Sequence, residues 1–456
     1  MSPPFIHSHP PGWWGRPDQV MAAVFPFLTS ADPVASSEGT LDPLGLYQVS
    51  DQLASKLVPA VRERMIRIRF LTAMAVGSFV TEGLESSPSE SNSSPYLAWE
   101  WHVVESIVRC REEVGGEDTI RGIPGTVVAR RAIGQHGYLD ARSYLATPRV
   151  FGFHGVYKRL AHHLGITNVH LGQGSAAERL VDAWAQDRGL GGLRGAMPLL
   201  EKWRDAVKRA LGEPSPRTRP GWAAADWKEL AQALLPDGAG TRERRCLRGM
   251  LLKPGAELGA LPDLWTLQEA NRDEHTAEAA LHDRLEALNP AYAPMLKAIR
   301  AYESFSRSLH DAFDVLRHRA ARIDSGGFAL SAIAADSDFR TSVATLPRQY
   351  AAASAAIGLL SEGGSELRVL FIDRFAAFES PMDPTHVAFA LRTLHETVQR
   401  GKSAEGKRPW FDSHGAGRIE VRHNYRIDQP TISPGQYLHA YRGAPIRRFY
   451  LDLERR

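Results

Sequence analysis

Apolar residues recur along most of the chain at the three- and four-residue spacing of helices that face a core. The longest apolar run, near residues 70–80, is too short to span a bilayer and predicts a buried helix. Helical spacing is strong again over residues 266–316. Two short segments, 367–372 and 418–425, read instead as β-strands. The pattern predicts a mainly α protein with small β elements.

Breaks rich in glycine, proline and serine divide this pattern into segments. At 456 residues the chain is long for one core, so we expect a multi-domain helical scaffold. The predicted segments are 1–114, an N-terminal arm (1–35) followed by a helical domain; 115–211, described next; 212–265, a basic linker with short helices; 266–362, a helical domain; and 363–456, an α/β lobe.

Residues 126–191 carry the most informative order of elements. Gly165 and Pro148 are typical helix terminators, and the spacing of Ser175 and Glu178 predicts a capping box before the last apolar-periodic stretch. A short alternating stretch ends in Gly-Gln-Gly, a sequence typical of a tight turn. The predicted elements are helices at 127–135, 139–145 and 155–164, a small β-wing at 166–171, and a helix at 176–188.

This order of three helices, a wing and a following helix resembles the winged helix-turn-helix family. The resemblance implies that the helix at 155–164 docks in a DNA major groove, with basic side chains on the flanking phosphates. Over the whole chain, the Trp- and Arg-rich, motif-poor sequence is similar to accessory proteins of bacterial anti-phage defence systems. That likeness implies protein partners, such as an ATPase, helicase or nuclease encoded nearby.

Charge gives independent support for DNA contact. The net charge of +3 decides little, but residues 121–170 hold seven Arg and Lys against one acid, Asp140. Phosphate binding needs such a cluster, because released counterions supply most of the non-specific affinity. Val156, Leu160 and Leu164 are predicted to face the core, and the basic residues to face solvent. The candidate DNA-binding residues are Arg130, Arg131, Arg142, Arg149, Lys158, Arg159, His162 and His163.

Catalytic and metal-binding patterns are not met. The histidines of this region show neither HExxH spacing nor a partner Cys pair, so we predict surface side chains and no bound metal; they are His136, His154, His162, His163 and His170. Gly172-Gln173-Gly174 lacks the further glycine and the lysine of nucleotide-binding loops. We therefore expect no catalytic residue and no cofactor.

Two acidic residues near the predicted strand at 367–372 support an alternative, a metal-dependent nuclease. Glu366 and Asp373 bracket the predicted strand at 367–372, and carboxylates at a strand's ends are ligands that Mg²⁺ accepts. The lysine that such sites use just beyond the second acid is missing, since Arg374 follows instead. A strand-end ion pair of Asp373 with Arg374 is the simpler interpretation.

The sequence therefore favours a non-catalytic DNA-binding subunit of a bacterial DNA-processing or anti-phage defence system. A protein–protein adaptor that uses the same fold without DNA contact is the alternative, and a cryptic metal-dependent nuclease is the third. Two distant cysteines, Cys110 and Cys246, exclude a disulfide scaffold. Without a signal peptide or a membrane span in the sequence, we expect a cytoplasmic protein.

Overall fold

Helices make up most of the computed structural model, which confirms a mainly α protein with small β elements. The structure describes residues 42–87, 93–112, 116, 123–145, 147–218, 221–253, 257–272, 276–321, 326–361, 363–402, 407–415 and 417–454, so the predicted arm at 1–35 lies outside the described residues. The α-helices are α2 (Tyr47–Leu57), α3 (Phe70–Val80), α4 (Pro95–Arg109), α6 (Thr126–His136), α7 (Pro148–Phe151), α8 (Phe153–His163), α9 (Ala177–Asp187), α10 (Leu193–Leu211), α11 (Ala224–Ala233), α12 (Thr241–Leu251), α13 (Leu261–Ala270), α14 (Glu278–Leu288), α15 (Ala293–Ala320), α16 (Ser337–Val343), α17 (Leu346–Gly358), α18 (Gly364–Phe375), α19 (Pro384–Arg400) and α20 (Gly443–Leu453). The 3₁₀ helices are η3 (Pro290–Tyr292), η4 (Leu330–Ala335), η5 (Ala376–Phe378) and η6 (His423–Tyr425), and the strands are β1 (Phe328–Ala329), β2 (Phe411–Ser413) and β3 (Arg418–Val421).

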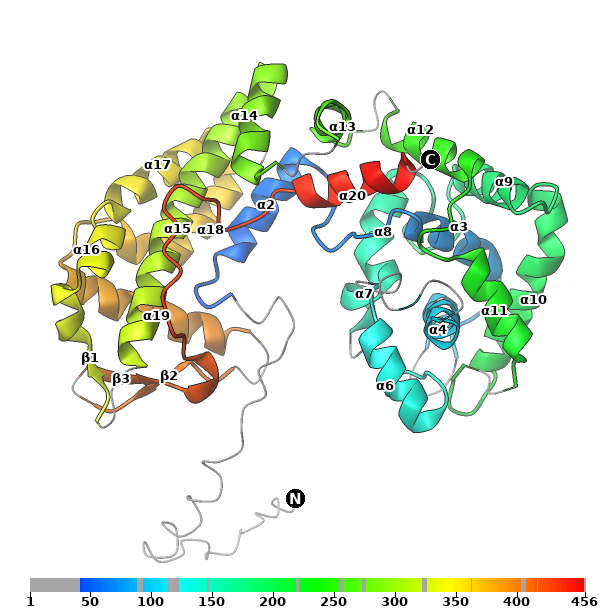
Figure 1. The fold of residues 1–456 in the computed structure, drawn as a ribbon, viewed down its shortest axis with the longest axis horizontal. Helices are drawn as coiled ribbons and strands as arrows, with labels where there is room; N and C mark the ends of the chain where they lie inside the picture. Colours follow the sequence, from blue (N-terminus) through cyan, green and yellow to red (C-terminus); the bar gives the residue numbers. More distant parts are fainter. Residues whose placement is uncertain are drawn as a thin grey trace, which may run out of the picture.

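The helices gather into two lobes, as Figure 1 shows. We call the part built from α3, α4 and α6–α12 the first lobe. The part built from α2, α14–α19 and the sheet is the second lobe. Helices α13 and α20 lie between them, with α20 packed against both α12 and α13. The last helix therefore returns to the first lobe after the chain has completed the second.

Helix α3 is the centre of the first lobe, because all 11 of its residues are buried. A helix without a polar face must be covered on every side, and α4, α8, α9 and α10 all contact it. Gly77 permits one close approach, since a Cβ there would lie 2.5 Å from the ring of Trp99. The Trp99 indole donates from Nε1 to the carbonyl of Ala73 at 3.1 Å. The buried helix predicted near residues 70–80 is confirmed.

The long helix α15 organises the second lobe. Its contacts include α2, α14, α16, α17 and strand β3. Strand β3 pairs antiparallel with both β1 and β2, and its fully buried Ile419 faces the helices together with Phe411 of β2, whose ring lies 5.6 Å from that of Phe313. The strand predicted at 418–425 is confirmed for its first four residues, Arg418–Val421.

Two arginines join the C-terminal segment to the α2–α3 region. The Arg442 side chain is 1% exposed, and its guanidinium binds the carboxylate of Asp51 and the hydroxyl of Ser55 on α2. Arg67, between α2 and α3, donates to the Asp452 carboxylate of α20 at 3.1 Å. These bonds fix α20 against both lobes.

The structure corrects the winged-helix prediction. Helices α6, α8 and α9 match three of the four predicted helices, but residues 139–145 form a turn. The Asp140 carboxylate accepts from the backbone N–H groups of Arg142 at 3.0 Å and Ser143 at 2.6 Å, a local bond that competes with a helix. Helix α6 packs against α4, and α8 and α9 pack against α3. Within the described residues, no winged-helix domain is identified.

The predicted wing at 166–171 is similarly reduced. A single antiparallel bridge joins Thr167 to Gln173, and the side chain of Asn168 accepts from the backbone of Gly172 between them. The predicted wing is therefore a short turn closed by one bridge, and not a pair of strands.

The predicted strand at 367–372 is also wrong, because this stretch lies inside α18. Leu367, Phe371 and Phe375 are fully buried at a spacing of four residues, whereas Val369 is 56% exposed. The segment's branched and aromatic residues favour a strand locally, but its buried face repeats as a helix does. Packing against α2 and α17 decides in favour of the helix.

The helices of the described ranges include none with the length and apolar character needed to cross a bilayer. The five-part domain division stays a prediction, to be compared with the two lobes of Figure 1.

A buried histidine makes the fold sensitive to acid. His395 is 0% exposed; its Nδ1 lies 2.9 Å from the Pro43 carbonyl, and its Nε2 accepts from the Trp410 N–H at 2.9 Å. Burial lowers the pKa of His395 from 6.5 to about 4. A proton on Nε2 would place the Nε2–H donor of His395 against the N–H donor of Trp410. Folding therefore requires the neutral ring.

We predict that the free energy of unfolding falls as the pH is lowered from about 6.5 to about 4. In this window the unfolded chain binds a proton that the folded His395 refuses, so stability rises with pH. The His395→Gln variant should lose up to about 1.4 kcal/mol per pH unit of this slope, measured by urea unfolding at several pH values. Exposed His136→Gln on α6 is the control. Equal slopes for all three proteins would contradict the assignment.

Candidate functional site: a basic hollow on the first lobe

A hollow of about 690 Å³ opens on the first lobe. Its walls are the end of α3 with the turn that follows, the start of α4, helix α8 and the loop at 168–173. Two of the predicted DNA contacts, Arg149 and Lys158, line this hollow together with His154 and His170. We call it the α8 hollow. It gathers cationic and neutral donors from segments that are far apart in the sequence.

A buried carboxylate holds one wall of the α8 hollow in place. Glu100 on α4 is fully buried and accepts from the backbone N–H of His154 at 2.9 Å. The Nδ1–H of the same histidine donates to Glu100 at 2.6 Å, and the Tyr144 hydroxyl donates at 2.9 Å. Burial and the charge of Glu100 hold the pKa of Tyr144 well above its usual range. With Nδ1 committed to Glu100, the imidazole has a fixed orientation at the hollow.

Two glycines allow the chain to close over this carboxylate. A Cβ on Gly152 would lie 2.0 Å from a Glu100 oxygen, so only glycine fits at the start of α8. A Cβ on Gly155 would lie 2.4 Å from the Arg149 backbone. The corner between α7 and α8 is therefore tight, and Arg149 is brought next to Lys158 at the hollow.

A row of basic side chains continues from the α8 hollow toward the second lobe. Arg64 lies over the ring of Phe151 on α7, with 4.9 Å from its guanidinium carbon to the ring centre. Burial and the charge of Arg159 lower the pKa of Arg62. We call this row the basic strip; its members are Arg62, Arg64, Arg149, Lys158 and Arg159. In Figure 1, α7 and α8 form the side of the first lobe that faces the second lobe.

Three members of the basic strip are exposed and have no carboxylate partner. Among the residues that the structure describes, Arg149, Lys158 and Arg159 make no ion pair. Glu82 also lines the hollow; its carboxylate accepts from the Gln173 amide at 2.8 Å and is paired with the Arg204 guanidinium at 3.9 Å. Uncompensated cations on one surface attract a polyanion.

The structure separates the remaining predicted DNA contacts from this strip. Arg130 and Arg131 are exposed on α6, and Arg142 is exposed in the turn that replaces the predicted second helix. None of these three lines the α8 hollow. His162 is exposed on α8, as predicted. His163 is half-buried, so it is less exposed to solvent than the prediction required.

The burial of α8 otherwise follows the prediction. Val156 and Leu160 are buried, and Leu164 is partly buried at the end of the helix. The prediction of surface histidines is correct for His136 and His170 and wrong for His154, which is 5% exposed. The reason is its pairing with Glu100, a residue 54 positions away that no local pattern connects to it.

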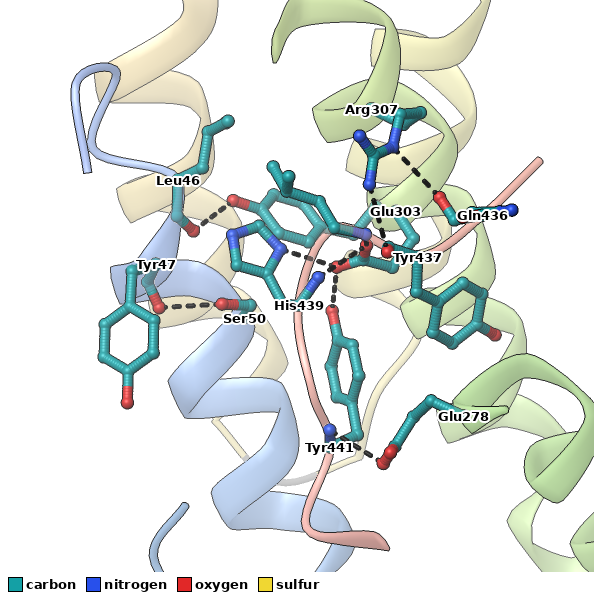
Figure 2. Close-up of polar contacts among 12 residues, drawn as sticks. Leu46, Tyr47, Ser50, Glu278, Glu303, Arg307, Gln436, Tyr437, His439 and Tyr441 are labelled. Carbon is teal, nitrogen blue, oxygen red and sulfur yellow. Dashed lines mark hydrogen bonds and ion pairs between the residues drawn. The ribbon is translucent and has the colours of Figure 1, made fainter. Parts of the chain in front are cut away.

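A second network of the same kind lies in the second lobe (Figure 2). Glu303 on α15 is buried and accepts from the Leu438 N–H at 2.5 Å and the Tyr441 hydroxyl at 2.6 Å. His439 donates to it twice, from the backbone N–H at 3.2 Å and from Nδ1 at 2.7 Å. Each lobe thus fixes one histidine through both its backbone and its ring on a buried glutamate.

The nuclease arrangement considered from the sequence is wrong. Glu366 and Asp373 lie on α18 and are seven residues apart. Seven residues of helix separate two side chains by about 10.5 Å along the axis, too far for a shared Mg²⁺. Within the described ranges, no group of three or more His, Cys, Asp or Glu residues is arranged to hold a metal ion.

Comparison with known proteins gives no relative. The chain matches no protein-family model, no curated protein and no solved structure.

We predict that Glu100→Ala destabilises the fold by about 3–5 kcal/mol, because three donors inside the first lobe lose their acceptor. Glu100→Gln keeps an acceptor oxygen and should cost less. Glu201→Ala, on the exposed face of α10, should stay within about 0.5 kcal/mol of the parent. Urea unfolding measures all three. An Ala variant at position 100 as stable as the parent would show that Glu100 does not anchor the α8 hollow.

Proposed function

We propose that this protein binds nucleic acid without catalysis, through phosphate contacts on the basic strip and in the α8 hollow. The observation that carries the proposal is the exposure of Arg149, Lys158 and Arg159 with no carboxylate partner among the described residues. A cluster of uncompensated cations on one surface supplies affinity for a phosphate backbone, because counterions are released from the nucleic acid when the phosphates are neutralised.

The geometry supports backbone contact more than base reading. The strip draws its cations from α7, α8 and the segment before α3, which are separate elements. Side chains spaced in this way suit phosphates along a strand, and they carry no sequence information by themselves. The proposed setting remains a multi-protein bacterial DNA-processing or anti-phage defence system, with catalysis supplied by partner subunits.

The test is a pair of charge-matched double variants. Lys158→Ala with Arg159→Ala removes two cations of the strip. Arg340→Ala with Arg348→Ala removes two exposed arginines from α16 and α17 of the second lobe. Fluorescence anisotropy with labelled duplex DNA of several sequences, at several salt concentrations, measures binding.

We predict that the strip variant binds every duplex more weakly than the parent, whereas the second-lobe control binds as the parent does. The slope of log affinity against log salt should flatten by about 0.9 for each phosphate that the variant no longer neutralises. Both double variants should unfold within about 1 kcal/mol of the parent, since exposed substitutions cost about 0.5 kcal/mol each.

Leu160→Ala is the comparison for a loss of folded structure, because it destabilises α8 and leaves the cations of the strip in place. Leu160 is fully buried on the opposite face of α8, so its truncation should destabilise by about 2–5 kcal/mol. If the strip variant binds DNA like the parent at every salt concentration, α8 does not touch the DNA. The protein–protein adaptor interpretation then takes precedence, with the strip as a surface for an acidic partner.

A further inference from the structure

A second cavity, of about 750 Å³, lies in the second lobe. Its walls are residues 42–48, which lead into α2, the ends of α18 and α19, and the segment at 438–440. Arg64 lines it as well, so the cavity adjoins the basic strip. Its volume is that of a small-molecule site. We call it the α2 cavity.

One wall of the α2 cavity presents a preoriented imidazole. Glu303 holds Nδ1 of His439 at 2.7 Å, and the ring stacks on Tyr302 with centres 6.1 Å apart. In Figure 2 the other side of the ring faces Leu46 and Tyr47, which also line the cavity. The Nε2 atom of His439 is therefore available to a molecule bound there, in an orientation that Glu303 fixes.

Part of the lining is cationic. Arg374 of α18 makes one hydrogen bond, to the Gln48 amide oxygen at 3.2 Å, and has no carboxylate partner among the residues described here. Its guanidinium lies against Gly45, where a Cβ would come within 2.0 Å of Nη1 and where φ is +70°. A glycine is needed at this point to admit the guanidinium. Most of the five N–H donors of Arg374 remain available for a ligand.

Lys402 stands on the same side, and its Nζ donates to the Asp42 carbonyl at 2.7 Å. Burial lowers the pKa of Lys402 to about 8, as expected for an ammonium group withdrawn from water. The Asp42 carboxylate is occupied, because it accepts from the N–H groups of Leu46 and Tyr47 at 2.9 Å each. The charged side chains of the lining are net positive, since two acids, Asp42 and Glu63, stand against the cations Arg64, Arg374 and Lys402.

Apolar residues complete the lining of the cavity. Pro43, Leu46, Val398 and Leu438 line the cavity, and the ring of Tyr47 is 46% exposed at its rim. Such a surface covers the uncharged part of an organic molecule, while the few polar groups fix its orientation. A bare inorganic ion would leave this wall without a partner.

We propose that the α2 cavity binds an organic phosphate of mononucleotide size, with its phosphate on Arg374 and Lys402 and a hydroxyl or ring nitrogen on Nε2 of His439. The planar guanidinium matches two phosphate oxygens, and the lysine supplies a second charge for a dianion. The ligand has two sources, a free mononucleotide or the terminal nucleotide of a strand held by the basic strip. The two phosphate contacts, Arg374 and Lys402, lie outside the basic strip, which shares only Arg64 with the cavity, so the proposal holds whether or not the strip binds DNA.

Isothermal titration of the full chain with AMP tests the proposal. Saturable one-to-one binding is expected. Arg374→Gln should weaken it about tenfold or more, because a charge-assisted hydrogen bond to the phosphate is removed. Arg348→Gln on α17 is the charge-matched control and should bind AMP as the parent does. The Lys158→Ala, Arg159→Ala double variant should also retain AMP binding, which separates this site from the strip.

His439→Asn tests the second contact. The asparagine amide can still donate to Glu303, so the network survives while the ring Nε2 is removed. Weaker AMP binding with an unchanged thermal unfolding transition supports the proposal. Competition of AMP by a 5′-phosphorylated oligonucleotide, but not by its 5′-hydroxyl counterpart, identifies a strand end as the source. Competition by neither identifies the free nucleotide.

Two results would overturn the proposal. One is the absence of saturable AMP binding at millimolar concentration. The other is AMP binding that neither Arg374→Gln nor His439→Asn weakens, because the nucleotide would then lie elsewhere on the protein.

Discussion

Each lobe depends on a buried glutamate that must find hydrogen-bond donors. A carboxylate taken out of water is costly unless its oxygens are satisfied, and the donors here come from far along the chain. Glu100 collects His154 and Tyr144 around α4, and Glu303 collects the segment from Leu438 to Tyr441 around α15. The hydrogen bonds to Glu100 fix one wall of the α8 hollow, and those to Glu303 fix one wall of the α2 cavity.

The same constraint explains why the candidate sites are preorganised. In each lobe the glutamate binds one histidine through its backbone N–H and its ring, so neither the chain path nor the ring orientation is free. The cations stand on other elements and are held differently: Lys158 is exposed on α8, and Arg374 is packed on Gly45. In each site the imidazole has a fixed position, and the longer cationic side chains can adjust to the position of a bound anion.

Local patterns predicted the helices well and the tertiary contacts poorly. The spacing of Val156 and Leu160 predicted the buried face of α8, and the largely apolar run near residues 70–80 predicted α3. The strand expected at 367–372 failed because branched residues were weighed above the four-residue spacing of Leu367 and Phe371. The winged-helix order failed in its arrangement, since α6 packs on α4, and α8 and α9 pack on α3.

The candidate sites were predictable only in part. Arg149 and Lys158 followed from local charge, and the structure places both at one hollow. The pairing of His154 with Glu100 spans 54 residues and that of His439 with Glu303 spans 136, so no motif announces either. A glycine at a tight corner was the signal in the sequence that could have indicated the first pairing. Gly152 lies two residues before His154, and it contacts Glu100.

The central claim is that nucleic acid lies along α7, α8 and the segment before α3. Hydrogen exchange of the full chain, with and without saturating duplex DNA, tests it most directly. We predict slower exchange on DNA binding at residues 62–67 and 149–163, with little change in α16 and α17. Protection confined to the second lobe, or no protection at any segment under conditions of measured binding, would contradict the account.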